Sequence, residues 1–371
     1  MFQNLKVLEL ASVLAGPSVG QFFAELGAEV IKVENLRTGG DVTRSWKTKG
    51  ENEGDLSAYF CCCNWGKKSV ALDLTTDEGK GIVQKLAAQS DVIIASYKPG
   101  DAEKLGVAYE QLKANNKQLI YGQITGYGAD DDRVGYDAVI QAESGFMELN
   151  GEKDGPATKM PVALIDVLAG HQLKEAVLLA LLKRERTGAG SLVEVSLLQT
   201  AIASLANQAT NWLVANKLPT RQGSAHPNIA PYGESFLTKD GKRILLAVGN
   251  DKQFQALATV LGKPELAQQP IYKSNENRVA NRTSLNEILS LSIMQFDGVE
   301  LASRLSASKV PAGLIQTVRE VLETPAAKGL FIRDNEMKGV RTFVGTGFGA
   351  VQLLSPPHFG QHTDEVLKMI S

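Results

Sequence analysis

LKVLELASVLAGPSVGQFFAELGAEVIKVE, residues 5–34, is the stretch that decides the fold of this chain. It begins with an apolar run at Lys6–Leu10 and ends with another at Val30–Val33, and both are typical of short buried strands. Between them, the turn Ala15-Gly16-Pro17 predicts a helix over about 18–26, with Ser18 as its N-cap. Two strands joined by a helix form the unit from which parallel sheets are built.

The same alternation continues along the chain, where apolar runs predict three more strands, at 69–72, 91–95 and 119–122. Farther on, the apolar segment Met160–Ile165 predicts another strand, which leads into a helix that ends at about Arg186. A second long helical stretch follows over 197–216. This order of elements predicts an α/β fold with a doubly wound parallel sheet.

The length of the chain indicates more than one domain. Its 371 residues exceed the ~250–300 at which a single core usually stops growing. From Ser235 to about Lys309 the pattern changes to strands and short helices, among them the apolar run Arg243–Val248. We expect this part of the chain to form a second, smaller α+β domain.

Composition excludes several classes of protein. Lys and Arg total 39 against 41 for Asp and Glu, so the net charge of −2 gives no basis for sequence-independent nucleic-acid binding. No run approaches the ~18 apolar residues of a membrane helix. The three consecutive cysteines, Cys61–Cys63, are too close to form ordinary disulfides with one another. We therefore expect a cytoplasmic protein that binds neither nucleic acid nor membrane.

Common catalytic motifs are missing. Ala15–Gly20, AGPSVG, lacks the glycines of a dinucleotide-binding turn, and no GxSxG sequence provides a serine nucleophile. The four histidines have no metal-ligand spacing, so we expect no metal.

Asp166 is the residue that stands out. It is the only charged residue between Met160 and Gly170, in a stretch that is otherwise apolar. One interpretation is that its carboxylate caps the helix that follows. The other is a carboxylate at the carboxyl end of a strand, where open α/β sheets bind ligands and where it could act as base or nucleophile. The two roles are compatible.

The chain resembles the family III CoA-transferases, which include formyl-CoA and carnitine-CoA transferases and the related α-methylacyl-CoA racemases. The resemblance follows the family's order over nearly the whole chain, in nine stretches: Leu5–Glu34, Gly39–Arg44, Asn64–Leu74, Asp91–Leu105, Gly135–Gly145, Ile165–Gly170, Arg186–Leu197, His226–Tyr232 and Gly360–Leu367.

This resemblance implies that Asp166 is a nucleophile. Its carboxylate would attack an acyl-CoA thioester to give a mixed anhydride, and the CoA thiolate would then form an aspartyl-CoA thioester, which an acceptor carboxylate reopens. Exchange of one thioester for another needs neither ATP nor metal. The resemblance thus implies acyl-CoA and a small carboxylic acid as co-substrates, with no permanently bound cofactor.

The resemblance also nominates binding residues. CoA carries phosphates, and the cations implied to bind it are Arg37, Lys68, Lys98, Lys104 and Arg133. Those implied to line the substrate pocket are Leu14, Tyr136 and His226.

Two departures from the family pattern narrow the expected reaction. Tyr136 occupies the position where racemases carry a histidine, and a tyrosine is a poor proton shuttle near neutral pH, so a transferase is favoured. Leu14 replaces the glutamine of the oxalate-handling branch, which favours a bulkier or less polar acid.

By the same resemblance, residues 1–200 and 325–371 form a discontinuous, Rossmann-like CoA-binding domain. Residues 225–320 form the small domain, 201–224 and 321–324 are linkers, and two chains form an interlocked homodimer. The alternatives left open are an acyl-CoA racemase or epimerase that acts at the α-carbon, and a non-catalytic CoA-binding protein.

Overall fold

The computed structural model describes residues 1–349 and 351–370, and its contacts group the chain into two units. The large unit joins Met1–Phe146, Lys159–Lys217 and Lys328–Ser371. The small unit joins Met147–Thr158 and Leu218–Ala327. Each unit has a hydrophobic core of its own.

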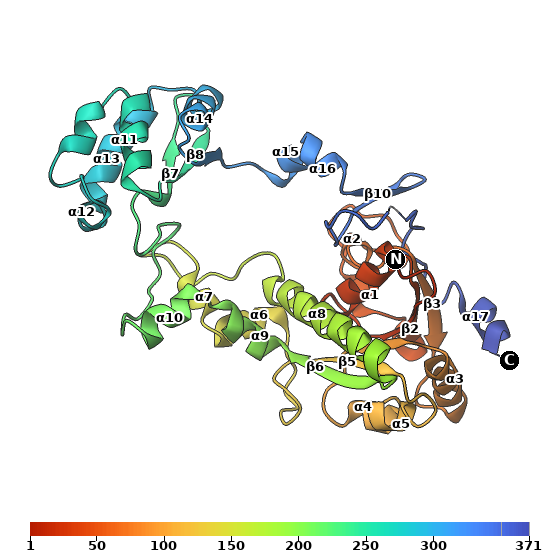
Figure 1. Cartoon of the computed structure of the whole chain (residues 1–371). Coiled ribbons are helices and arrows are strands. Elements are labelled where there is room, and N and C mark those ends of the chain that lie inside the picture. Colours follow the sequence, from red (N-terminus) through yellow and green to blue (C-terminus); the bar gives the residue numbers. More distant parts are fainter. Residues whose placement is uncertain (350, 371) are drawn as a thin grey trace. The chain divides into compact units, whose positions relative to one another are not determined.

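Six parallel strands form the central sheet of the large unit (Figure 1). Their order is β3-β2-β1-β4-β5-β6, and the order along the chain reverses between β1 and β4. Val7 of β1 pairs with Val30 on one side and with Val92 on the other. The predicted α/β fold with a parallel sheet is confirmed. The bounds of the strands are β1 Lys6–Leu10, β2 Glu29–Asn35, β3 Lys67–Leu72, β4 Val92–Ala95, β5 Ile120–Thr125 and β6 Ser191–Ser196.

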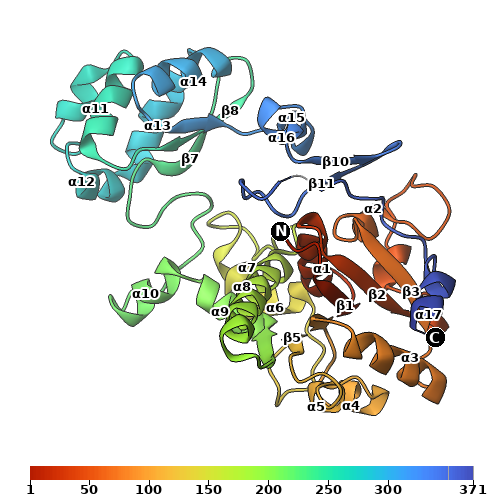
Figure 2. The same cartoon turned by 45° about the vertical axis from the view of Figure 1, so that its right-hand side comes forward.

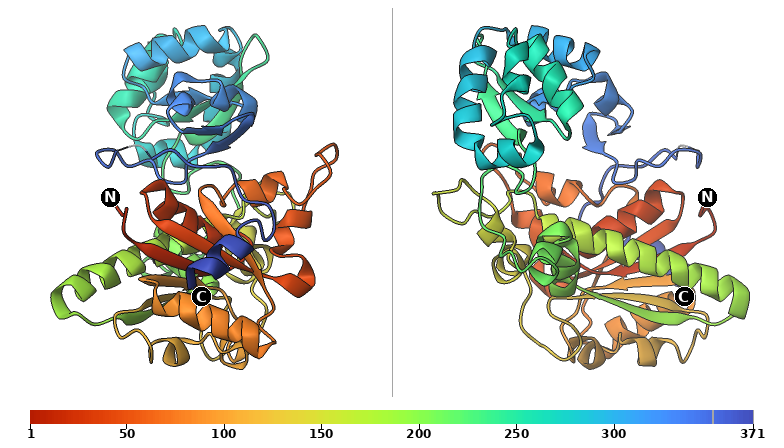
Figure 3. Two further views of the ribbon diagram at one scale, coloured as in Figure 1. Left: turned by 90° about the vertical axis from the view of Figure 1, so that its right-hand side faces the viewer. Right: turned by 60° about the vertical axis from the view of Figure 1, so that its left-hand side comes forward.

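Helices cover both faces of this sheet because successive side chains of a strand point to opposite faces and the side chains on both faces are apolar. Val7 and Ile94 belong to the core under α1 (Ala15–Glu25) and α8 (Leu164–Thr187), whereas Leu8 and Ile93 belong to the core on the other face. Figure 3 shows α8 running along its face of the sheet. The remaining helical segments of the large unit are η1 Leu36–Thr38, η2 Val42–Ser45, α2 Ala58–Cys61, α3 Asp77–Ala88, α4 Asp101–Leu105, α5 Tyr109–Leu112, α6 Asp137–Glu143, α7 Phe146–Leu149 (which ends in the small unit), α9 Leu197–Ser204 and α10 Asn207–Leu213.

Two glycines allow α8 to lie close to its neighbours. A Cβ on Gly122 of β5 would come within 3.1 Å of Leu173 and of Val177, and a Cβ on Gly170 would collide with Ser18 Oγ on α1. The start of α8 is therefore held tightly against both α1 and the sheet.

Local predictions around the two helices were partly wrong. Helix α1 starts at Ala15, since a proline is tolerated in a first helical turn, and Ser18 is not its N-cap but donates its hydroxyl to Ala15 O. The segment 160–165 forms no strand, because the amide of Gln141, and not a neighbouring strand, binds the backbone N–H of Met160. The helical stretch 197–216 is broken at Ala206, whose φ is 47°.

The C-terminal segment returns to the large unit. It forms the hairpin β10 (Phe331–Asp334) and β11 (Met337–Val340) and then the helix α17 (Thr363–Ile370). Thr363 Oγ1 accepts a hydrogen bond from Ala71 N, which places α17 beside β3 (Figure 2). Arg44 also donates to Pro357 O. Residues nearly 300 positions apart are thereby joined at one edge of the sheet.

The small unit is an antiparallel sheet packed against helices. Its strands have the order β7-β8-β9, and Phe254, Leu257 and Leu289 are among the buried residues of its core. The bounds of its elements are β7 Tyr232–Leu237, β8 Arg243–Ala247, α11 Asp251–Val260, η3 Pro264–Gln268, α12 Asn275–Ala280, α13 Arg282–Ile293, α14 Gly298–Ala307, β9 Ala312–Leu314, α15 Val318–Leu322 and α16 Pro325–Lys328, which ends at the unit boundary.

Among the residues that the structure describes, no helix combines the length and the apolar character needed to span a bilayer.

Candidate functional site

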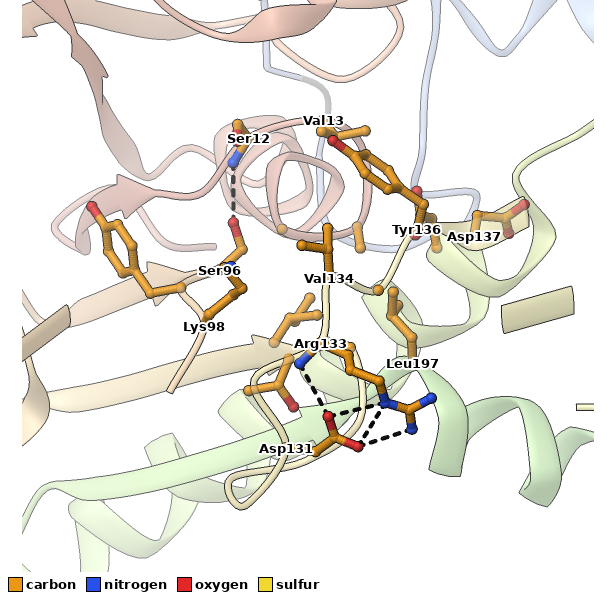
Figure 4. Close-up of a pocket in the computed structure, with 18 of the residues that line it drawn as sticks. Ser12, Val13, Ser96, Lys98, Asp131, Arg133, Val134, Tyr136, Asp137 and Leu197 are labelled. Carbon is orange, nitrogen blue, oxygen red and sulfur yellow. Dashed lines mark hydrogen bonds and ion pairs between the residues drawn. The ribbon is translucent and has the colours of Figure 1, made fainter. Parts of the chain in front are cut away.

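A pocket lies at the carboxyl ends of β1, β4 and β5, beside the amino-terminal turns of α1 and α8 (Figure 4). This is the point where the strand order reverses, which is where open parallel sheets bind their ligands. Among the residues that line the pocket are Val13, Lys98, Arg133, Tyr136 and Asp166.

Asp166 occupies the first turn of α8. The N-cap of this helix is Ala163, so Asp166 is the third helical residue and its side chain forms no cap hydrogen bond. The interpretation of Asp166 as a helix cap is thus wrong. The side chain is buried, with 7% of the residue exposed, and no hydrogen bond or ion pair satisfies its carboxylate among residues 1–349 and 351–370.

This isolation changes the acidity of Asp166. Burial, together with the nearby charge of Asp137, raises the pKa of the Asp166 carboxyl to about 7. Burial and the charge of Asp166 likewise raise the pKa of Tyr59, on α2, to about 12. A carboxylate that is easily protonated is more basic and a better nucleophile when ionised than an ordinary surface aspartate.

Asp137 provides the cap that Asp166 does not. Its Oδ1 accepts a hydrogen bond of 2.7 Å from Ile165 N, in the first turn of α8, and its Oδ2 accepts one of 2.6 Å from Gln141 Nε2. Gln141 Oε1 in turn accepts a hydrogen bond of 2.8 Å from Met160 N. Sequence reasoning missed Asp137, although the spacing of Asp137 and Gln141 places both on one face of α6 and could have indicated a paired role.

The loop between β1 and α1 is held in an unusual conformation. Val13 has φ of 73°, a region that β-branched residues rarely occupy. Its N–H donates to both carboxylate oxygens of Asp41, at 3.3 and 3.2 Å, and its carbonyl accepts from Cys63 Sγ at 3.6 Å. Ser12 N donates to Ser96 Oγ, which fastens the loop to the end of β4.

Buried ion pairs fix the position of Asp41, which holds this loop. Lys32 Nζ lies 3.0 Å from Asp41 and 3.0 Å from Glu9, and Lys67 Nζ lies 2.7 Å from Glu9. Burial opposes the charge of Lys32, but Asp41 and Glu9 outweigh it and raise the pKa of its ammonium. Burial likewise opposes ionisation of Asp41, yet Lys32 and Thr43 lower the pKa of its carboxyl.

A second pocket shares Ser12 and Tyr97 with the pocket of Asp166, and it contains another buried ion pair. Arg44 binds Glu34 with two hydrogen bonds, Nε to Oε1 at 2.8 Å and Nη2 to Oε2 at 2.7 Å. Burial opposes ionisation of Glu34, but these bonds together with the charge of Lys32 lower the pKa of its carboxyl.

Two of the cations predicted to bind CoA line the pocket of Asp166. Lys98 follows β4, and no ion pair engages its ammonium within the described part of the chain. Arg133 forms an ion pair of 2.9 Å with Asp131, which raises the pKa of its guanidinium, and it stacks 3.8 Å above the ring of Tyr127. Figure 4 shows Arg133 and Asp131 on the side of the pocket away from Val13.

The other three cations lie elsewhere in the large unit. Arg37, on η1, contacts Thr75 Oγ1 at 3.5 Å. Lys68, at the amino end of β3, forms ion pairs with Glu29 and Glu365. Lys104 pairs with Asp101 on α4, and 76% of its side chain is exposed. The structure does not bring these three cations to the lining of the Asp166 pocket, and their role in CoA binding stays a prediction.

The three residues predicted for the substrate pocket differ in position. Tyr136 lines the pocket, is 52% exposed, and lies on the same side as Val13 in Figure 4. Leu14 is the N-cap of α1, and the lining includes its neighbours Val13 and Ala15 instead. His226 belongs to the small unit, where its ring packs against Tyr232 with centroids 5.3 Å apart.

The three cysteines are free thiols: Cys61 is half-buried, Cys62 is exposed and Cys63 is buried. Within the described ranges, 1–349 and 351–370, no group of three or more potential ligands could hold a metal ion.

Comparison with known proteins gives consistent matches. The model of the family described as CoA-transferase family III matches residues 2–363. The chain is 39% identical to the succinate–glutarate CoA-transferase of Agrobacterium fabrum, over 98% of this chain and 94% of that protein. It is 35% identical to the succinyl-CoA:glutarate CoA-transferase of Homo sapiens, over 99% and 85% of the two chains. The crystal structure of a CAIB/BAIF family protein from Brucella suis superposes with a TM-score of 0.88 and 40% identity, and covers 100% of this chain and 99% of that one.

Proposed function

Because the chain belongs to CoA-transferase family III, an enzyme family that uses CoA thioesters, we propose that it moves CoA between two carboxylic acids through a covalent intermediate on Asp166. The observation that carries this proposal is the buried carboxylate of Asp166, which has no partner among the described residues and lies in a pocket that Lys98 and Arg133 also line. The strand order, which reverses beside this pocket, supports a Rossmann-like CoA-binding domain.

The proposed reaction proceeds by balanced exchanges at carbonyl carbon. The Asp166 carboxylate attacks the thioester carbonyl carbon, the C–S bond breaks, and CoA leaves as a thiolate while an acyl-aspartyl anhydride forms. The thiolate then attacks the aspartyl carbonyl, which releases the first acid and leaves an aspartyl-CoA thioester. The acceptor carboxylate reverses both steps in turn and regenerates Asp166. Each step replaces one acyl bond with another, so no external energy source is needed.

Backbone N–H groups can stabilise the charge that develops on the carbonyl oxygens. Ala15 and Gly16 open α1 and line the pocket, and the N-cap Leu14 offers no side-chain acceptor for their N–H groups. In the proposal these donors, at the positive end of the helix, face the oxyanion of each tetrahedral intermediate.

The proposed acids are short dicarboxylates. Succinate and glutarate appear in the names of the two relatives described above. In the pocket of this chain, the ammonium of Lys98 has no ion-pair partner among the described residues, so it can bind the second carboxylate of such an acid or a CoA phosphate. Arg133 provides a second cation in the lining.

A homodimer, interlocked as in the resemblance, is part of the proposal. Helix α8 exposes Leu179, and α10 with its C-cap exposes Trp212, Leu213 and Val214. Exposed large apolar side chains on neighbouring turns are typical of an interface. A monomer by light scattering at micromolar concentration would contradict this part of the proposal.

The test is a mass-spectrometric assay with succinyl-CoA and a panel of dicarboxylic acids. We expect new CoA esters with the wild type, and Asp166→Ala to lose at least about a thousandfold in kcat. Asp132→Ala, a neighbouring exposed aspartate outside the pocket lining, is the matched control and should retain activity.

Trapping separates the alternatives. Hydroxylamine should modify Asp166 only after the enzyme has met an acyl-CoA, because only then is the aspartyl carbonyl activated. Full activity of Asp166→Ala would refute the mechanism. Deuterium exchange at the α-carbon without transfer to any acid would instead indicate a racemase, and absence of any adduct or turnover would indicate a CoA-binding protein.

A further inference from the structure

Asp137 is a buried carboxylate that the proposed reaction does not use. It starts α6, lines the same pocket as Asp166, and is only 8% exposed. No cation forms an ion pair with it in the described part of the chain, 1–349 and 351–370. A buried charge in this situation is costly unless it has a specific role.

Hydrogen bonds explain how this charge is tolerated. The 2.7 Å bond from Ile165 N and the 2.6 Å bond from Gln141 Nε2 each reach a different oxygen of Asp137. Because Gln141 also accepts from Met160 N, Asp137 and Gln141 bind both ends of the segment 160–165. This segment has no strand neighbour, so the two side chains fix the backbone from which Asp166 projects.

The same carboxylate also acts on Asp166 by its charge. Ile165, whose N–H donates to Asp137, is the residue directly before Asp166, so two buried carboxylates share one side of the pocket. The other ionisable groups that face Asp166 are the phenol of Tyr59 on α2 and, around the pocket, Lys98, Asp131, Arg133 and Tyr136. Burial is the main cause of the raised pKa of Asp166, and the charge of Asp137 raises this pKa further.

We propose that Asp137 is a positioning residue for the nucleophile: it holds the first turn of α8 and places a second buried negative charge in the pocket of the Asp166 carboxylate. The inference rests on the proposed function of Asp166. It predicts two separable effects, one on geometry and one on ionisation, and therefore a test that a purely structural role would fail.

Three variants separate the two effects. Asp137→Asn removes the charge and keeps an acceptor for Ile165 N, but its amide NH2 group replaces the oxygen that accepts from Gln141 Nε2. Asp137→Ala removes both the charge and the acceptor. The double variant Asp137→Asn/Gln141→Glu restores every hydrogen bond, since the new amide at position 137 can donate to the new carboxylate at position 141, which still accepts from Met160 N. It also moves the negative charge one side chain away from Ile165.

The measurement is kcat/KM for CoA transfer between pH 5.5 and pH 9. We expect the wild type to gain activity as the pH rises through about 7, where Asp166 ionises. In Asp137→Asn this acid limb should move to lower pH, with a plateau within about threefold of the wild type. Asp137→Ala should show the same shift with a plateau at least about tenfold lower, because the first turn of α8 loses its acceptor. In the double variant, the plateau of kcat/KM should return to the wild-type value, and the acid limb should lie between those of the wild type and Asp137→Asn.

The inference is refuted if the acid limb of kcat/KM lies at the same pH as in the wild type in both Asp137→Asn and the double variant. The exposed control Asp132→Asn should leave the limb unmoved, and a shift in that variant would also count against the inference. If Asp137→Asn fails to fold, the double variant decides alone, because its hydrogen bonds are complete. Failure of this inference and failure of the proposed function are distinguishable: activity in Asp166→Ala refutes the nucleophile, whereas an unmoved limb with inactive Asp166→Ala refutes only the role of Asp137.

Discussion

The large unit contains two groups of buried carboxylates, and among the described residues only one of the groups is neutralised by cations. The paired group consists of Glu9, Glu34 and Asp41, each within ion-pair distance of Lys32, Lys67 or Arg44. The unpaired group consists of Asp137 and Asp166. Burial opposes ionisation in both, yet the pKa of Asp41 is lowered and that of Asp166 is raised. The difference indicates that the neighbouring cation, and not depth of burial, decides whether folding lowers or raises the pKa of these carboxyls.

The two groups contribute to stability with opposite signs. A carboxyl whose pKa is lowered by folding, such as Asp41, stabilises the native state above the unfolded pKa, and that contribution is lost as the pH falls through the folded pKa. A carboxyl whose pKa is raised, such as Asp166, binds its proton more tightly in the folded state. Its contribution to stability therefore falls as the pH rises from about 4 to about 7, and the loss is complete above that range.

The largest effect is expected when the paired group is broken. Arg44→Ala removes both hydrogen bonds to Glu34, the contact with Pro357 O and the packing on the Phe60 ring, 3.7 Å away. It leaves Glu34 buried without its cation, so we expect a loss of about 3–5 kcal/mol in the free energy of unfolding, measured by urea denaturation at pH 7.5.

The control for this prediction is Arg304→Ala, which breaks an exposed pair with Glu300 on α14. It should cost no more than about 0.5 kcal/mol. Equal small losses in the two variants would mean that burial of the Arg44 pair adds nothing.

A smaller effect of opposite sign is expected in the unpaired group. Asp166→Asn removes a buried charge that has no partner among the described residues, so the variant should be more stable than the wild type at pH 8. Each unit of pKa corresponds to about 1.4 kcal/mol, so we expect a gain on the order of a few kcal/mol at pH 8 that shrinks as the pH falls toward 4.

Urea denaturation at pH 8, 6 and 4.5 measures this difference. Asp41→Asn is the matched control, and it should lose stability at pH 8 because Lys32 would then be buried without one of its carboxylates. The comparison between the two groups breaks down if both asparagine variants change stability in the same direction at pH 8.

Sequence patterns predict five of the six strands of the large sheet, β1 to β5, because each contains a local apolar run, whereas β6 (Ser191–Ser196) includes polar residues and was not predicted. Val30–Val33 and Ser69–Leu72 lie within β2 and β3 as observed. The pattern fails at Met160–Ile165. An apolar run becomes a strand only when it can pair with the edge of a sheet. Here the backbone N–H of Met160 binds the side-chain amide of Gln141 and not a neighbouring strand.

The site was predictable only where one residue carries the signal. Asp166 stands out because it is alone among apolar residues, whereas Lys98 was nominated only by the resemblance to the family. Asp137 has no such signal, because its role depends on a hydrogen bond to Ile165, 28 residues away. Nor does composition distinguish Lys98, which lines the pocket, from Lys104, which pairs with Asp101 on the surface. Such roles arise from contacts distant in sequence and need the fold.

The smallest effect concerns the backbone strain at Val13, a residue whose N–H is bound by Asp41 of the paired group. Val13 is held at a φ of 73° by Asp41, which is itself bound to Lys32. Glycine adopts this conformation without steric cost, whereas a residue with a Cβ pays roughly 1–2 kcal/mol, part of which the greater freedom of unfolded glycine offsets. We therefore expect Val13→Gly to be about 0.5–1 kcal/mol more stable than Val13→Ala, although both variants lose the contacts of the two Val13 γ-methyl groups. Thermal and urea unfolding of the two variants measure the difference directly. A Val13→Ala variant at least as stable as Val13→Gly would mean that the loop carries no strain for Asp41 to hold, and that the paired group acts on the pocket through charge alone.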